Sequence, residues 1–288
     1  MSTLSATLSP PIARPVSRRP PVPNSRALLT IARRRFTLSA STPRELLVPL
    51  LTPILFALVI APALAKMVGH VAGGLNYTTY VAVGTVGLLV PLSCTFAGIG
   101  VIVDRESGAR RELLAAPIPR SLHVLGNLAV ALTISLLQLL ALILATLARG
   151  SRFHTDAAGV LWFAGAVALF AIFSYAVAET LANRIATQEE FVAATPAIAI
   201  LPWFLAGSLF PLHVLPLGLA AFAKVLPLTH ALALMRYGLL DRRGTGLHDI
   251  WGMTNTTAMA TLSLAVVALY AAVLTAVAIR VFTRAAVQ

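Results

Sequence analysis

The sequence predicts an all-α integral membrane protein with six transmembrane helices, a short charged helix on the cytoplasmic side and an extracellular re-entrant helical pair before the last span. Three observations predict this class. Hydrophobic residues make up 58% of the 288 positions, and the mean hydropathy is +0.86. Only 11% of the residues are charged, against roughly a quarter in soluble domains. Apolar runs long enough to cross a bilayer of about 30 Å recur along the chain.

Residues 1–45 are basic and rich in proline and serine, and we expect them to form a mostly disordered cytoplasmic tail. Eight of the 22 Lys+Arg lie there. A short amphipathic piece near Ala27 to Phe36 is expected to lie on anionic lipid headgroups. The alternative is that the tail only fixes the topology, because positive charge stays inside. Neither reading needs a nucleic acid, so we expect no such partner despite the net charge of +12.

The remaining residues, 46–288, form the expected transmembrane domain. Its six apolar runs are Leu46–Ala65, Tyr77–Val103, Leu122–Ala148, Ala157–Leu181, Phe191–Phe210 and Thr257–Phe282. Between the last two lies a proline-broken apolar stretch, from Pro211 to about Leu240. Its pieces of roughly 10 to 15 residues suit re-entrant or interfacial segments better than full spans. A count of seven spans is the alternative.

Charge predicts the orientation. With six spans and the N-terminus inside, fifteen of the 22 Lys+Arg lie on the cytoplasmic side and seven outside. Four of those seven fall in the long last loop, where the positive-inside rule is weakly enforced. Both termini are therefore expected in the cytoplasm.

Several kinds of chemistry are missing from the sequence. The six histidines never recur at a spacing of four, so the H-E-x-x-H metal motif is absent. Neither lysine follows a glycine, which excludes the G-x-x-x-x-G-K-[ST] phosphate loop. Apart from boundary residues, Glu179 is the only acid in or near an apolar run, whereas ion-driven carriers usually need ionisable groups near the midplane. We expect no catalytic residue, no metal site and no cofactor bound by this chain.

The stretch "DRESGARRELLAAPIPR", from Asp104 to Arg120, places four arginines and three acids between two apolar runs. We call it the charged loop. Asp104 is expected to cap a helix in it, because its carboxylate can accept N–H groups of the first turn. Glu106 and Arg110 have the i, i+4 spacing of a helical ion pair. Pro117 is expected to end this helix.

The predicted product is a short charged helix with a leucine ridge, Leu113 and Leu114, held beneath the membrane. Most charge runs are solvated faces, so the alternative is a connecting helix whose charges only keep it inside.

The longer stretch "DRESGARRELLAAPIPRSLHVLGN" resembles the loop after the second span of ABC-2 type exporter permeases, the family that includes daunorubicin-type drug exporters. The matching residues are Asp104, Arg105, Glu106, Gly108, Leu113, Leu114, Pro117, Pro119, Arg120 and Gly126. Ala109 stands where threonine is common in the family, and Asn127 where lysine is common.

A second stretch, "LFPLHVLPLGLAAFAKVLPLTHALALMRYGLLDRRG", resembles the family's proline-rich segment before the last span. The matching residues are Phe210, Pro211, Leu215, Pro216, Leu226, Pro227, Leu228, Thr229, His230 and Arg236. The resemblance extends from about Leu46 to Phe282.

The resemblance implies an ATP-driven exporter in the cytoplasmic membrane of a bacterium. In such an exporter two permeases pair, as a homodimer or heterodimer, over two copies of a separate ATPase that binds the ATP and magnesium. The coupling helix that docks on the ATPase would contain Asp104, Arg105, Glu106, Gly108, Leu113, Leu114, Pro117 and Arg120. The extracellular gate segment would contain Phe210, Pro211, Pro216, Pro227 and His230, although a purely structural role is favoured for His230.

Two further classes of function stay open: a secondary carrier or channel that is not coupled to ATP, and a membrane-embedded enzyme. The nearly uncharged spans favour a hydrophobic or amphiphilic substrate, such as a drug, an antibiotic or a lipid-like molecule. Polysaccharide or glycolipid export by the same architecture is the alternative.

Overall fold

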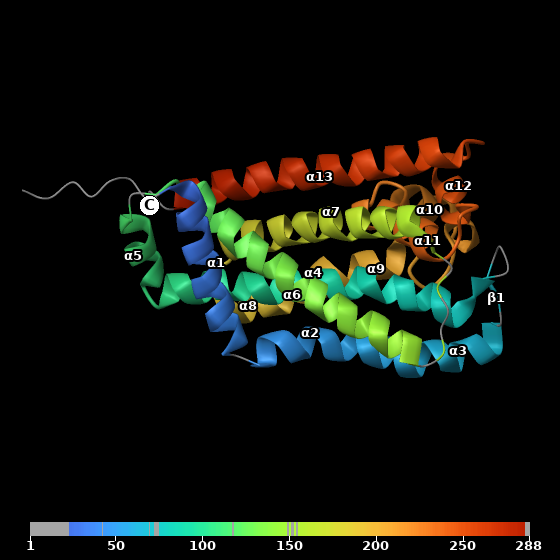
Figure 1. Cartoon of the computed structure of the whole chain (residues 1–288), viewed down its shortest axis with the longest axis horizontal. Helices are drawn as coiled ribbons and strands as arrows, with labels where there is room; N and C mark the ends of the chain where they lie inside the picture. Colours follow the sequence, from blue (N-terminus) through green and yellow to red (C-terminus); the bar gives the residue numbers. More distant parts are fainter. Residues whose placement is uncertain are drawn as a thin grey trace, which may run out of the picture.

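The computed structural model describes residues 23–41, 43–68, 70–71, 75–116, 118–148, 150, 153 and 155–285. Four long helices run along its longest dimension (Figure 1). They are α4 (Tyr77–Glu106), α6 (Ser121–Ala148), α7 (Ala157–Ala182) and α13 (Thr256–Ala285), and each is long and apolar enough to cross a membrane. They coincide with the second, third, fourth and last predicted spans.

The first and fifth predicted spans are helical but interrupted. The first consists of α2 (Pro43–Leu55), the π-helical segment η1 (Phe56–Ile60) and α3 (Ala61–Val68). The fifth consists of α8 (Gln188–Thr195), the π-helical segment η3 (Pro196–Ile200) and α9 (Leu201–Leu205).

Proline explains both interruptions. A proline has no N–H to donate to the carbonyl four residues earlier. Pro62 leaves the Leu58 carbonyl without that donor, and Pro202 does the same to Ile198. Both carbonyls lie inside the π-helical segments, where the hydrogen-bond register is locally shifted. At 1.5 Å per residue, the run 188–205 reaches about 27 Å, so it nearly matches the hydrocarbon layer. The six-span count stays a prediction.

The proline-broken stretch before the last span forms a bent pair. Helix α10 (Leu217–Ala223) and helix α11 (Pro227–Leu239) meet at 81°. Helix α12 (Thr245–Trp251) follows and leads into α13. All three short helices gather at one end of the molecule (Figure 1). A bend of this size fits either a broken span or a re-entrant pair, so the re-entrant topology stays a prediction.

The opposite end carries the charged loop. Helix α5 (Ala109–Ala115) and the N-terminal helix α1 (Asn24–Ala40) lie there, across the direction of the long helices, together with the C-terminal end of α13 (Figure 1). The short antiparallel pair β1 (His70–Val71) and β2 (Leu75–Asn76) lies at the end of α10–α12. The described N-terminal helix and the end of α13 are thus on one side.

Helix α4 is the centre of the bundle. Its most apolar window is 78% buried, against 22% for that of α13. Helix α7 packs against α4, α11 and α13. The Trp203 indole donates a hydrogen bond of 2.8 Å to the Gly84 carbonyl, which ties α9 to α4. The core therefore lies between the second, fourth and last spans and the re-entrant pair.

Side chains cap the starts of several helices. Asn76 accepts from the Thr78 amide at 2.9 Å, Asp156 from the Gly159 amide at 2.7 Å and Thr187 from the Glu190 amide at 3.3 Å. Each satisfies a backbone donor that the helix itself leaves unpaired. The Gly159 amide, with Arg242 beside it, holds the pKa of the Asp156 carboxyl below its ordinary value.

The arrangement of the two ends predicts opposite accessibility for Glu106 and Lys224, which are both exposed. The single thiol, Cys94, is buried and can be removed as Cys94→Ala. In that background we expect a membrane-impermeant maleimide to label Lys224→Cys in intact cells, and Glu106→Cys only after permeabilisation. Labelling of both from outside would mean that the run 188–205 does not cross the membrane.

Candidate functional site

The charged loop begins inside α4 rather than beyond it. Asp104, Arg105 and Glu106 occupy the last turn of α4, and α5 starts at Ala109 after Gly108. The prediction that Asp104 caps the loop helix is therefore wrong. Gly108 has φ of 78° in the left-handed region, where a side chain would strain the backbone. This turn separates α4 from α5.

The same turn breaks the expected Glu106–Arg110 ion pair. Glu106 is exposed and accepts a hydrogen bond of 3.2 Å from the Gln188 amide at the start of α8. Arg110 instead lies over the Phe282 ring, 4.9 Å from its centroid, near the end of α13. The pairing failed because the i, i+4 rule holds only within one continuous helix.

Three arginines of the charged loop donate to backbone carbonyls at the ends of other helices. Arg105 donates to the carbonyl of Ala182, the last residue of α7, at 3.1 Å, and to those of Ile185 and Ala186 in the turn that follows, at 2.8 and 2.7 Å. Arg120 donates to the Thr283 carbonyl of α13 at 3.1 Å. These carbonyls carry the partial negative charge of a helix C-terminus.

Arg110 completes the contact to α13 with a longer hydrogen bond of 3.5 Å to the Phe282 carbonyl. Burial lowers the pKa of its guanidinium, an effect that the charge of Glu179 opposes. An arginine stays protonated in a protein even so. The charged loop is therefore tied to α7 and α13 by permanent cations, not merely solvated.

The N-terminal helix α1 is also joined to this loop. Arg34 forms an ion pair of 2.9 Å with Asp104. Next to it, Arg35 is buried and donates to the Ala97 carbonyl at 2.9 Å. Gly100 makes this possible, because a Cβ there would lie 1.5 Å from the Arg35 guanidinium. The expected amphipathic piece near Ala27 to Phe36 is thus helical.

Helix α1 has two different faces. Its buried face consists of Ala27, Ile31, Arg35 and Ser39, at a helical spacing of four. The opposite face exposes Arg26 and Arg33 together with Leu29 and Phe36. Contact of that face with lipid headgroups stays a prediction. Residues 1–22, which hold the start of the predicted tail, lie outside the described residues.

The leucine ridge is half-buried within the chain itself. Leu114 packs against the main hydrophobic core, and Leu113 lines a small cavity with Phe282, His123 and Asn127. The accessible part of the charged loop is therefore its charged surface, where Glu106, Arg111 and Glu112 are exposed. Pro117, the predicted helix stop, lies outside the described residues.

The contact between α1 and the charged loop predicts a measurable effect on α1. The Arg34 side chain is 37% exposed, so solvent screens the pair and it contributes about 1 kcal/mol; Asp104→Asn should therefore speed hydrogen exchange of the α1 amides about fivefold. Asp104→Arg should speed it further through repulsion by Arg34. The double variant Arg34→Asp with Asp104→Arg should return towards the wild-type rate. Unchanged exchange in Asp104→Arg would show that α1 is held without this pair.

The predicted gate segment lies around the re-entrant pair. Phe210 is exposed and tilted against the Tyr77 ring, with 6.5 Å between centroids. Pro211 and Pro216 precede the short 3-10 turn and α10, and Pro227 is the first residue of α11. Proline suits these positions because its fixed φ starts a helix and the missing N–H is not needed there.

His230 is buried, and both of its ring nitrogens have partners. Nε2 lies 2.9 Å from the Lys224 carbonyl and Nδ1 lies 3.2 Å from the Ser263 hydroxyl. The ring also faces Trp251, at 5.6 Å between centroids. These contacts hold α10, α11, α12 and α13 together, which supports the structural role expected for this residue.

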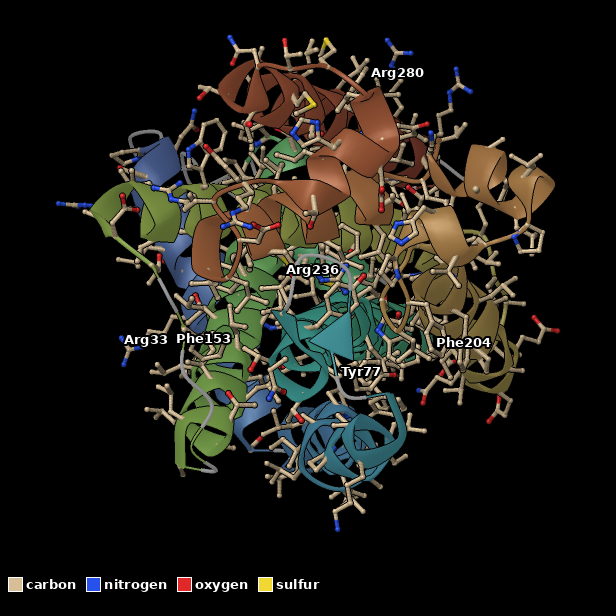
Figure 2. The ribbon with its side chains drawn as sticks, turned by 90° about the vertical axis from the view of Figure 1, so that its right-hand side faces the viewer. Arg33, Tyr77, Phe153, Phe204, Arg236 and Arg280 are labelled. Atoms are coloured by element: carbon tan, nitrogen blue, oxygen red, sulfur yellow. The ribbon has the colours of Figure 1, made fainter. Side chains whose placement is uncertain are left out.

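Arg236 is one of the four cations that the sequence predicts in the long last loop, outside the membrane. In the structure it is buried in α11. Its guanidinium donates to the carbonyls of Gly207 and Ser208, each at 2.9 Å, and lies 3.5 Å from the centroid of the Tyr80 ring. The Tyr80 hydroxyl donates to the same Gly207 carbonyl at 2.9 Å. Figure 2, viewed from this end, shows Arg236 near the middle of the bundle.

Arg236 thus joins α11, α4 and the turn after α9. The sequence contained two signals of this role. The first is that Arg236 is among the residues that match the family's proline-rich segment. Its position as a cation within an apolar run was a second signal, since such residues face the protein interior.

Substitutions at this contact should lower thermal stability in a definite order. Arg236→Lys keeps the charge but replaces the planar guanidinium group with an ammonium group. The ammonium group cannot donate to both carbonyls with the same geometry. Tyr80→Phe removes one hydrogen bond, worth about 1 kcal/mol, and leaves the ring beneath the guanidinium. We therefore expect a larger loss of melting temperature in Arg236→Lys than in Tyr80→Phe.

The buried thiol of Cys94 can report unfolding in detergent through a thiol-reactive fluorogenic dye. Arg243→Lys, at an exposed position of the same end, is the control and should leave the melting temperature unchanged. An unaltered melting temperature in Arg236→Lys would mean that the two guanidinium hydrogen bonds to the Gly207 and Ser208 carbonyls do not stabilise the fold.

Long apolar helices, a charged loop tied to their ends and a bent helical pair at the opposite end are the features of a multi-pass membrane protein. The comparisons with known proteins agree. The family model described as "ABC-2 type transporter" matches residues 26–240, so this chain belongs to the ABC-2 type transporter family. The match includes α1, the charged loop and the gate segment, and it ends before α13.

Two curated relatives match about two thirds of this chain. Nodulation protein J of Rhizobium leguminosarum bv. trifolii is 28% identical over 195 residues, which cover 67% of this chain and 72% of the relative. Nodulation protein J of Sinorhizobium fredii (strain NBRC 101917 / NGR234) is 29% identical over 187 residues, covering 64% and 70%.

Proposed function

We propose that this chain is the membrane subunit of an ATP-driven exporter and that the charged loop receives the conformational change of a separate ATPase. One observation carries the proposal. The loop is continuous with α4 and α6, and side-chain contacts tie it to α1, α7 and α13. A displacement of the loop would therefore act on five helices at once.

The exposed surface of the charged loop is the proposed ATPase contact. Glu106, Arg111 and Glu112 are exposed, while the cations Arg105 and Arg120 are turned towards the chain's own helix ends. In this proposal the three exposed charged side chains bind the ATPase. Arg105 and Arg120 transmit the movement of the ATPase to the helices they contact. A ligand shifts a two-state protein only by binding the states differently, so ATP-driven closure of two ATPase copies supplies the differential binding.

The complete transporter in this proposal contains two permease copies, as a homodimer or heterodimer, in the cytoplasmic membrane of a bacterium. Both termini and the charged loop face the cytoplasm, where the arginines of α1 and the charged loop gather. The gate segment closes the opposite end, and Arg236 holds α11 against α4 there.

The cargo of the proposed exporter is hydrophobic or amphiphilic, as in the daunorubicin-type exporters that the charged loop resembles. Polysaccharide or glycolipid export by the same architecture is the second candidate. Transport without ATP is the third, and it predicts that the charged loop needs no partner.

A charge reversal at Glu106 tests the coupling. Glu106→Arg only adds positive charge to an inside loop, so insertion should be unaffected. Like-charge contact at an interface costs several kcal/mol, so the variant should lose most transport and most of the ATPase that co-purifies with the wild-type permease.

Two controls separate the interface from the fold. Gln188→Ala removes only the hydrogen bond that Glu106 accepts within the chain, and it should couple normally. Arg184→Glu reverses an exposed charge at the same end outside the charged loop, and it should matter less. Normal transport and normal ATPase retention in Glu106→Arg would refute the docking role. Loss of both in Gln188→Ala would assign the effect to the internal contact.

A further inference from the structure

A groove of about 540 Å³ lies between the C-terminal ends of α7 and α13, at the end of the bundle that carries the charged loop. Three arginines line it: Arg184, just after α7, and Arg280 and Arg284, one turn apart on α13. All three are exposed. The volume is within the range of about 300–1,000 Å³ that is usual for ligand sites.

These three cations have no anionic partner in the part of the chain that the structure describes. None of their guanidinium groups takes part in an ion pair or a hydrogen bond there. Helix α13 contains no acid, and the one acid of α7, Glu179, is fully buried and accepts hydrogen bonds from Tyr175 and Asn183. Glu189 and Glu190, at the start of α8, do not line the groove. Neighbouring like charges repel, so the cluster favours a bound anion.

The charged loop uses the other side of α13. Arg110 lies over the Phe282 ring, and Arg120 donates to the Thr283 carbonyl. The groove-lining residues of α13 recur at spacings of three and four, so they form a separate face of the helix. Because the charged loop already supplies donors to the end of α13, the arginines of the groove are left for an external anion.

The groove also has an apolar part. Val277 and Val281 line it, and Val273, one turn nearer the middle of α13, is 50% exposed. Helix α13 forms the outer edge of the bundle (Figure 1), and its most apolar window is only 22% buried. Figure 2 shows Arg280 at the periphery, pointing away from the bundle. The apolar part of the groove therefore continues onto a helix face that is open to lipid.

We propose that this groove binds an anionic phospholipid, with the phosphate among the three arginines and the upper part of the acyl chains on Val277 and Val281. A guanidinium group can donate two parallel hydrogen bonds to phosphate oxygens. Basic pockets between spanning helices hold anionic headgroups. A zwitterionic phospholipid brings no net charge to offset three cations, so the groove selects the anionic lipid. A free phosphate ion has the same oxygens but leaves the apolar part unused.

Quenching by spin-labelled lipids tests this site in the purified full chain in detergent. A bimane fluorophore on Val273→Cys, in the Cys94→Ala background, reports a lipid that occupies the groove one turn away. Phosphatidylglycerol and phosphatidylcholine carry the same spin label near the top of one acyl chain. Phosphatidylglycerol should give half-maximal quenching at a mole fraction at least about twentyfold lower, because each nearby arginine favours an anionic lipid about fivefold.

The variant Arg280→Gln with Arg284→Gln should lose about fivefold of this preference for each arginine removed, with quenching by phosphatidylcholine unchanged. Arg280→Lys with Arg284→Lys keeps both charges and should keep most of the preference. Arg33→Gln with Arg111→Gln is the matched control, since it removes two exposed arginines from the same end that do not line the groove. It should be quenched as the wild type is.

Three results would each overturn the inference. The first is equal quenching of the wild type by the two lipids. The second is an equal loss of preference in the matched control, which would assign the effect to overall charge. The third is recovery of fluorescence with inorganic phosphate beyond that with chloride at the same ionic strength, which would assign the groove to a free ion.

The quenching experiment contains no ATPase, so it separates this inference from the proposed function. Its failure would remove the lipid site and leave the coupling role of the charged loop as it stands. Only the origin of the lipid, in the cytoplasmic leaflet, rests on the proposed function, because that proposal places this end of the bundle in the cytoplasm.

Discussion

The structure depends on one constraint: backbone carbonyls in apolar surroundings need donors wherever a helix ends or bends. Guanidinium groups meet this need at both ends of the bundle. Arg105 and Arg120 donate to the carbonyl ends of α7 and α13, and Arg236 donates to the turn after α9. Arginine suits the task because it carries five donors in a fixed plane and keeps its charge when partly buried.

This constraint links stability to the proposed mechanism. The donors that satisfy the helix ends belong to the two segments assigned to coupling and gating. A movement of the charged loop would therefore exchange carbonyl partners at α7 and α13 rather than simply displace a solvated connector. At the other end, α11 can leave α4 only if Arg236 gives up two carbonyls and the Tyr80 ring.

Prolines supply the irregular backbone between those ends. Pro62 and Pro202 follow the two π-helical segments, and Pro227 begins the buried helix α11. Two of them, Pro202 and Pro227, also line an apolar cavity of about 230 Å³ inside the bundle. Broken helices in membrane proteins are tolerated where they are buried or line a cavity. The run 188–205 and the re-entrant pair meet that condition.

The sequence by itself determined the helices and their class. Apolar length located α4, α6, α7 and α13 to within a few residues, proline spacing located the bent pair, and the charged loop with its matching residues indicated the family. These features are local, so a window of neighbouring residues contains them.

Only the tertiary structure decided what the side chains contact. It removed Asp104 from its expected cap and separated Glu106 from Arg110. It also buried Arg35 and Arg236. Each of those contacts joins segments that lie far apart in the sequence, as Arg34 and Asp104 do across 70 positions. Helical periodicity predicts on which face of its helix a residue lies, but not which other helix packs against that face. The contacts of the candidate site depend on that packing partner.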